Sequence, residues 1–201
     1  MEAPDHSPAG PHDKPHAARI GWRRQHTRRV SEGPINHLRV DDLSIPGRGT
    51  IRYSYLERGE SVIVLPVTRE GQVVLIRQYR YPVDEHCLEL PAGCCRDQSS
   101  AALEEVARRE LREEVGGTAE SLEYVSWFYS SSSLSDETCH LFLAHGVAIQ
   151  PADAATEPGE HLEVLLVPAA EAVEMARTGR VKTGTCALAI LMCADRLVAT
   201  R

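Results

Sequence analysis

The sequence predicts an α+β fold in which short strands stand on both sides of one central helix and further helices close the chain. Short segments rich in Val, Ile and Leu alternate with Gly, Pro and acidic turn signals, which is typical of strands joined by tight turns. Residues 101–115 instead carry apolar side chains at helical spacing. An apolar stretch after Gly179, from about 183 to 194, predicts a last helix.

The N-terminal part divides into a leader and a small sheet. Residues 1–18 are rich in Pro, His, Ala and Asp and have no hydrophobic periodicity, which predicts a disordered leader. Residues 19–58 predict a small antiparallel sheet, a β subdomain that precedes the main domain. Its strands are expected at 28–30, 37–40 and 50–56, between turn signals at Gly33-Pro34 and Pro46-Gly47.

The main domain is expected over residues 59–201, and its central helix ends at a glycine C-cap signal, Gly116-Gly117. A hairpin turn at Arg69-Glu70-Gly71 joins the first two strands. A further helix begins at Pro168. The expected strands are 61–67, 72–78, 87–90, 122–129, 138–147 and 161–167.

Composition and charge exclude several classes of partner. The 201 residues carry a formal net charge of -7 with no compensating basic stripe, which argues against a nucleic-acid partner. No apolar run reaches membrane-spanning length and the first thirty residues lack an apolar signal core, so we expect a cytoplasmic protein without a membrane partner. The six cysteines include no Cys-x-x-Cys pair, and Cys186 and Cys193 are expected to be small buried apolar residues.

The central helix carries carboxylates on the face that should be buried. At about 100° per residue, Glu110 and Glu114 lie only about 40° apart, and Glu113 stands at the edge of the same face. Like charges at this spacing destabilise a helix, and removing them from water costs far more unless a cation arrives. A hard divalent cation with oxygen ligands would remove both problems. The alternative is a solvated acidic face. The apolar residues that share this face are Leu103, Val106, Ala107 and Leu111.

Several separated motifs accompany this helix and together resemble a known family. Gly93 followed by the run Arg109-Glu110-Leu111-Arg112-Glu113-Glu114-Val115-Gly116 resembles the signature of the Nudix hydrolases. The remaining motifs resemble the ADP-ribose and nucleotide-sugar pyrophosphatase branch of that family. They are Arg77-Gln78-Tyr79-Arg80-Tyr81-Pro82, Glu89-Leu90-Pro91-Ala92-Gly93, and Trp127-Phe128-Tyr129 leading to Ser135-Asp136-Glu137.

The resemblance implies a Nudix-like α/β/α sandwich with a mixed sheet, and a metal-dependent enzyme. The expected metal is Mg²⁺, with Mn²⁺ as a substitute. The implied reaction is hydrolysis of the diphosphate linkage of ADP-ribose or a related nucleoside diphosphate sugar, giving a nucleoside monophosphate and a sugar phosphate. The resemblance also implies a homodimer formed through the N-terminal sheet. Hydrolysis of nucleoside triphosphates or RNA caps fits the motifs less well.

The chain departs from the family pattern between Gly93 and the central helix. The loop is two residues longer than usual, and Ala101 stands where the family has a glutamate that pairs with the arginine at position 109. We therefore expect Glu105, one turn earlier on the helix, to pair with Arg109. The departures leave an alternative function open: a Nudix-fold nucleotide-sugar binding or regulatory module with little turnover.

By resemblance, metal ligands are expected from Glu110, Glu114 and the backbone carbonyl of Ala92. Glu113 is expected as a further ligand or as a catalytic residue that orients the others. The general base is expected in the acidic loop before the last strand, at Glu160, with Glu157 as second choice. The alternative for this loop is a solvent-exposed acidic segment.

Substrate contacts are expected first from Arg77 and Arg80, because guanidinium groups suit phosphate oxygens. Tyr79 could stack on a base or sugar, although packing at a strand end would explain it equally well, and alternation lets only one parity of this strand face the site. Ser135 and Glu137 could reach a terminal sugar. The alternative is that Asp136 and Glu137 cap the next strand.

Overall fold

The computed structural model describes residues 14–32, 37–95, 100–150, 154 and 162–198. The chain separates into two units. Unit 1 holds Met1–Gly59 with Ser131–Glu137, and unit 2 holds Glu60–Ser130 with Thr138–Arg201. The units differ from the domains expected at 19–58 and 59–201, because Ser131–Glu137 groups with the N-terminal sheet.

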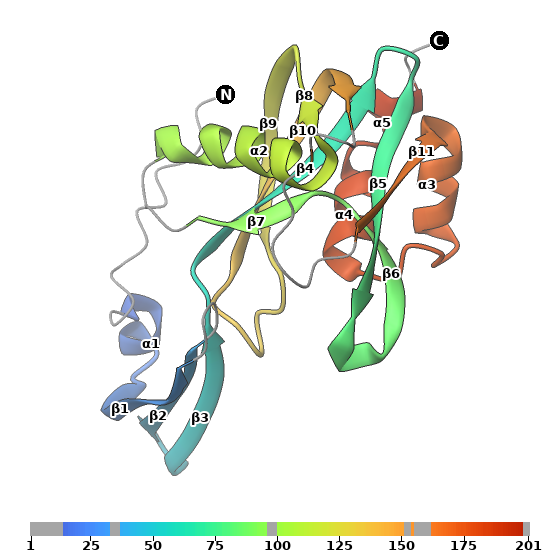
Figure 1. The fold of residues 1–201 in the computed structure, drawn as a ribbon. Helices are drawn as coiled ribbons and strands as arrows, with labels where there is room; N and C mark the ends of the chain where they lie inside the picture. The colour runs from blue at the N-terminus through green and yellow to red at the C-terminus, as the bar shows by residue number, and fades with distance from the viewer. Residues whose placement is uncertain (1–13, 33–36, 96–99, 151–153, 155–161, 199–201) are drawn as a thin grey trace. The chain divides into compact units, whose positions relative to one another are not determined.

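The described part of unit 1 is a three-stranded antiparallel meander (Figure 1). Gly47, in the turn between its second and third strands, and Gly49, the first residue of the third, adopt positive φ angles of 71° and 79°, a conformation that favours glycine. The strands are β1 (Arg23–Glu32), β2 (His37–Ile45) and β3 (Gly49–Glu57), each longer than the segment expected from sequence.

A short helix, α1 (Pro15–Arg19), precedes this sheet. Residues 15–18 of the leader predicted to be disordered are therefore helical. Proline at the first helical position suits this start, since its missing N–H would have no helical partner there. The rest of the predicted leader, residues 1–13, lies outside the described residues.

Main-chain bonds attach Ser131–Glu137 to the end of β3. The Leu56 N–H donates to the Leu134 carbonyl at 2.8 Å, and the Asp136 N–H donates to the Leu56 carbonyl at 3.2 Å. The Asp136 carboxylate accepts the Arg58 N–H at 2.8 Å. These bonds extend the small sheet, which is why the segment groups with unit 1.

A buried ion network crosses the sheet of unit 1. Both carboxylate oxygens of Glu57 accept from Nη2 of Arg39, at 2.8 and 2.9 Å, and Arg29 Nε donates to the same carboxylate at 2.8 Å. Glu57 and Arg39 are 8% and 4% exposed. Burial alone would raise the pKa of Glu57, but the hydrogen bonds from Arg29 and Arg39 outweigh it and hold the pKa below its usual range.

We expect Glu57→Gln to lower the free energy of unfolding by about 3 kcal/mol at pH 7, because Arg39 stays buried without its counter-charge. The pKa of Glu57 is lower in the folded than in the unfolded state, so the contribution is present above the ordinary value of 4.5 and is lost as pH falls through the folded pKa. Urea unfolding of both proteins at pH 7 and pH 3 measures this. An equal gap at both pH values would contradict an ionic origin.

The described residues of unit 2 form a mixed eight-stranded sheet in which β11, β5, β4, β10 and β8 are neighbours in that order. β6 adds to β5, β7 to β4 and β9 to β10, and only the β4–β10 pair is parallel. The short strands β7 and β8 were not expected, because two or three residues carry no alternating pattern. The strands are β4 (Glu60–Thr68), β5 (Gln72–Arg80), β6 (Glu85–Glu89), β7 (Ala92–Cys94), β8 (Gly117–Thr118), β9 (Ser121–Tyr129), β10 (Thr138–Ile149) and β11 (Leu162–Pro168).

Helices cover both faces of this sheet (Figure 1). Alternate residues of β4 point to opposite faces, so Val62 and Val64 pack with α2 (Ser100–Val115) while Ile63 and Leu65 belong to the core on the other side. That second core also contains residues of three C-terminal helices. The arrangement confirms the expected α/β/α sandwich with a mixed sheet. The C-terminal helices are α3 (Ala169–Arg177), α4 (Gly184–Met192) and α5 (Ala194–Val198).

Cys186 and Cys193 are buried, as expected, at 3% and 0% exposure. Burial raises the pKa of the Cys186 thiol to about 12, so this group is neutral at physiological pH. None of the helices in the described part of the chain is long and apolar enough to cross a membrane.

Candidate active site

Glu110 lies against the backbone of β7 and is only 8% exposed. A Cβ atom placed on Gly93 would overlap the Glu110 carboxylate, so the glycine makes room for this side chain. The Pro91-Ala92-Gly93 motif and the central helix are therefore in direct contact. The sequence-predicted metal ligand Glu110 and Gly93 belong to one site.

Glu114 contacts the same strand one residue earlier. Its carboxylate accepts the Ala92 N–H at 3.2 Å. Ala92 stands opposite Ile63 in the β4–β7 ladder, whereas the next pair bonds directly through the Val64 N–H and the Pro91 carbonyl. Hydrogen-bonded and non-bonded pairs alternate in an antiparallel ladder, so the N–H and carbonyl of Ala92 point away from β4. Two helix carboxylates thus meet the edge of β7.

Arg109 neutralises part of this negative charge. Its Nη2 donates to Glu110 at 2.7 Å and to the Cys94 carbonyl at 3.4 Å, and its Nε lies 3.6 Å from Glu113. The hydrogen bond to Glu110 raises the pKa of the Arg109 guanidinium. The expected pair of Arg109 with Glu105 does not form among the described residues. Arg109 instead pairs with the adjacent Glu110 and with the i+4 residue Glu113.

The donor set fits a hard divalent cation. Carboxylate oxygens and a backbone carbonyl are the ligands that Mg²⁺ accepts in proteins, and Gly93 leaves the space in which the Glu110 carboxylate sits. Within the described ranges, no three His, Cys, Asp or Glu side chains converge as a ready cluster of metal ligands. Arg109 occupies part of the coordinating edge of Glu110, and Glu113 is half exposed at 47%.

The two candidate arginines of β5 have different surroundings. Arg80 donates to Glu89, and this hydrogen bond raises the pKa of its guanidinium. The negative charge of Glu114 acts on the same guanidinium in the same direction. Arg77 instead pairs with Glu163 of β11 at 3.2 Å. Arg80 therefore lies within electrostatic range of one carboxylate of α2.

The Tyr79 side chain contacts residues of the β5–β6 hairpin to which it belongs. Its hydroxyl donates to Asp84 at 2.8 Å, and its ring makes an edge contact with His86 at a centroid distance of 5.7 Å. Tyr79 remains 43% exposed. These contacts are those of strand-end packing, and the stacking role stays a prediction.

The other predicted residues belong to unit 1 or lie outside the described residues. Ser135 and Glu137 belong to unit 1, where the Ser135 hydroxyl accepts the Glu137 N–H at 3.1 Å and Glu137 lies 3.6 Å from Arg58. Glu157 and Glu160 lie outside the described residues. Within unit 2, the described part of the site comprises the carboxylates of α2, the edge of β7 and Arg80.

Sequence reasoning missed one residue of this site, Glu89. It is 5% exposed and accepts a two-pronged hydrogen bond from Arg80. Its place in the Glu-Leu-Pro-Ala-Gly motif was visible, but its burial and its partner depend on the pairing of β5 with β6.

Comparison with known proteins identifies the family. The NUDIX domain model matches residues 57–184. An ADP-ribose pyrophosphatase of Bacillus subtilis (strain 168) is 30% identical over 161 residues, covering 80% of this chain and 86% of that protein. A methanol dehydrogenase activator of Bacillus methanolicus is 27% identical over 164 residues, covering 82% and 88%.

A solved structure supports the fold. The crystal structure of an ADP compounds hydrolase matches with a TM-score of 0.73 at 18% identity, covering 88% of this chain and 94% of that one. Its likeness extends over the small antiparallel sheet and the larger mixed sheet. The family match, the shared architecture and the carboxylate helix against Gly93 lead to one conclusion. This chain belongs to the Nudix family and is a Nudix hydrolase.

Proposed function

We propose that the protein catalyses the Mg²⁺-dependent hydrolysis of the diphosphate linkage of ADP-ribose or a related nucleoside diphosphate sugar. The observation that carries this proposal is the meeting of Glu110 and Glu114 with the backbone of Ala92 and Gly93. The similar ADP-ribose pyrophosphatase of Bacillus subtilis supports the substrate class. The products would be a nucleoside monophosphate and a sugar phosphate.

In this proposal Glu110, Glu114 and the Ala92 carbonyl hold Mg²⁺, and Glu113 is a further ligand or orients the others. The bound ion supplies charge neutralisation on the diphosphate and activation of water. Mn²⁺ is the expected substitute. Helix α2 fixes the carboxylates more rigidly than a loop could, which favours alignment for in-line attack.

The remaining residues bind substrate and move the proton. Arg80 holds diphosphate oxygens, because its guanidinium lies within electrostatic range of Glu114. Arg77, Tyr79, Ser135 and Glu137 stay proposed substrate contacts on the ground of family resemblance alone.

Glu160 is the proposed general base, again by resemblance. We expect Glu160→Gln to lower kcat by about 10²- to 10⁴-fold, the usual range for a lost general base. Steady-state kinetics of this variant beside Glu157→Gln assign the role. Near-normal turnover in Glu160→Gln, with loss in Glu157→Gln, would move the base to Glu157.

A panel of ADP-ribose, GDP-mannose, UDP-glucose and ATP, each with Mg²⁺, tests the function. Chromatographic identification of AMP and ribose 5-phosphate from ADP-ribose is the expected result. Release of inorganic phosphate or pyrophosphate from ATP alone would contradict the nucleotide-sugar assignment.

The alternative is a nucleotide-sugar binding or regulatory module with little turnover. It is favoured by the relative named as a methanol dehydrogenase activator and by Ala101 in place of the family's glutamate. Binding of ADP-ribose by titration calorimetry, without product formation during hours of incubation with Mg²⁺, would favour this alternative.

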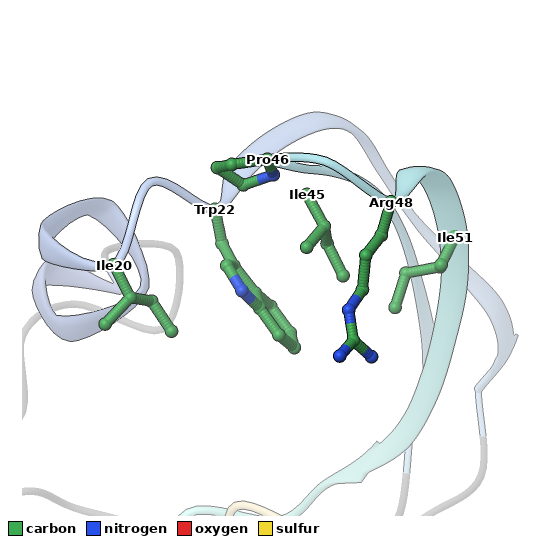
Figure 2. Close-up of a pocket in the computed structure, with 6 residues that line it drawn as sticks. All are labelled: Ile20, Trp22, Ile45, Pro46, Arg48 and Ile51. Atoms are coloured by element: carbon green, nitrogen blue, oxygen red, sulfur yellow. The ribbon is translucent and has the colours of Figure 1, made fainter.

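We also propose a cytoplasmic homodimer in which the small sheet of unit 1 meets a second copy. Figure 2 shows the side chains of an apolar pocket at one end of this sheet, with the Trp22 ring between Ile20 and Ile45. Such a surface suits a partner of the same kind. Sedimentation at micromolar concentration checks this, and a stable species of 22.2 kDa would contradict it. The pocket residues are Ile20, Trp22, Ile45, Pro46, Arg48 and Ile51.

A further inference from the structure

Glu89 is a carboxylate that lies buried in the fold next to Arg80. It is 5% exposed, and taking such a group out of water is costly unless it is paired and hydrogen-bonded. Its partner Arg80 provides this from Nε, at 3.0 and 3.2 Å to the two oxygens, and from Nη2 at 2.5 Å. The Arg80 side chain, in contrast, is 48% exposed. The carboxylate is therefore enclosed while the guanidinium reaches the surface.

The geometry of this pair leaves part of the guanidinium for a ligand. The bonds to Glu89 use Nε and Nη2. Among the described residues, no protein acceptor takes the N–H groups of Nη1. Because a guanidinium is planar and has five donors, fixing one edge also fixes the direction of the others. The Arg80 guanidinium is held within the electrostatic range of Glu114, a proposed metal ligand.

A second element braces the carboxylate. Thr183 precedes α4 at the N-cap position, where a threonine hydroxyl usually accepts a bond from the helix backbone. Here it makes no such cap and instead donates to Glu89 at 3.0 Å. The neighbouring Leu90 N–H donates to the neutral thiol of Cys186 at 3.3 Å. Two bonds thus attach α4 to the end of β6, and the capping hydroxyl is diverted to the carboxylate.

We propose that Glu89, braced by Thr183, is a positioning residue that holds the Arg80 guanidinium in the direction in which it meets the substrate diphosphate. This inference rests on the proposed function, because it takes Arg80 as a diphosphate contact. The proposal gives Glu89, the buried first residue of the Glu-Leu-Pro-Ala-Gly motif, a role separate from metal binding. It also links substrate binding to the start of α4.

Glu89→Gln keeps the shape of the side chain but removes its charge. We expect KM for ADP-ribose to rise about tenfold and kcat to fall about threefold, since a misdirected arginine weakens binding and alignment. Arg80→Ala should show at least the same loss in kcat/KM. Because Glu89 acts through Arg80, the double variant Arg80→Ala/Glu89→Gln should match Arg80→Ala within about twofold. Additive losses would overturn the proposal.

Thr183 provides the second variant, which does not depend on the folding of Glu89→Gln. We expect Thr183→Val to raise KM about threefold and Thr183→Ser, which restores the hydroxyl, to return it to the wild-type value. Glu85→Gln is the matched control. Glu85 is a carboxylate of the same strand, but it pairs with Lys182 at 2.7 Å and is half exposed. An equal rise of KM in Glu85→Gln, or no rescue by serine, would overturn the positioning role.

The wild-type protein separates this inference from the proposed function. If wild type hydrolyses ADP-ribose and the Glu89 and Thr183 variants behave as wild type, only the positioning role fails. If wild type binds ADP-ribose without turnover, the proposed function fails, and the same comparison is made on Kd by titration calorimetry, with a tenfold weakening expected for Glu89→Gln. If wild type neither binds nor hydrolyses ADP-ribose, both fail. Thermal unfolding of every variant verifies that the folded protein is being compared.

Discussion

Glu114→Gln is expected to lower kcat by about 10³-fold, which corresponds to about 4 kcal/mol of lost transition-state stabilisation. Glu114 stands on the buried face of α2, and its carboxylate reaches the Ala92 N–H at 3.2 Å. The glutamine amide oxygen can still accept that N–H, so the fold is retained. The negative charge that would bind Mg²⁺ is lost.

Two measurements separate metal loss from unfolding. Titration with Mn²⁺ should show binding at least tenfold weaker in Glu114→Gln than in wild type, while the melting temperature stays close to that of wild type. The control is Glu105→Gln, which changes an exposed glutamate of the same helix. Unchanged Mn²⁺ affinity in Glu114→Gln would remove Glu114 from the set of metal ligands.

Gly93→Ala is expected to lower kcat/KM by about 10²-fold, because the added methyl group takes the space of the Glu110 carboxylate. Glu110 must then leave the edge of β7, and its bond with Arg109 is disturbed. Overpacking of this kind also lowers the free energy of unfolding by about 1–3 kcal/mol. The variant thus tests whether the glycine of the motif is required for the position of a ligand.

A matched control is available at Gly184, where an added Cβ would meet no atom within 4 Å and the backbone has no positive φ. Gly184→Ala should keep the activity and the stability of wild type. Activity and urea unfolding of the two alanine variants are compared side by side. Full activity in Gly93→Ala would contradict the close packing of Glu110 on β7 as a requirement for turnover.

Several features of the fold followed from local sequence patterns. The helical spacing of Leu103, Val106 and Leu111 predicted α2, and the apolar runs predicted most strands of the larger sheet. These signals are reliable because burial repeats with the period of the element itself. The very short strands β7 and β8 have too few residues to show such a period. The division of the last helical segment into α4 and α5 was not predicted either, because the five residues of α5 are too few to show a separate period.

The candidate site was predicted unevenly for a physical reason. Glu110 and Glu114 share one face of one helix, so their proximity follows from helical geometry. The partner of Arg109 did not follow, because Glu105, Glu110 and Glu113 are all near it along the helix, and local spacing does not decide among them. Confirmation of the family also does not establish the general base, since Glu160 lies outside the described residues.

By itself, the sequence determined the α+β class, the Nudix family and the helix that carries the carboxylates. Tertiary structure decided the charge partners of the two candidate arginines of β5. Arg77 and Arg80 are three residues apart on one strand, yet Arg77 pairs with Glu163, which stands opposite it on β11. Arg80 instead pairs with Glu89, four residues beyond the Glu85 that stands opposite it on β6. Periodicity is a local property of the chain, but charge partners are set by which distant segments become neighbours in the sheet. These neighbours come together only when the sheet assembles and its two cores are buried.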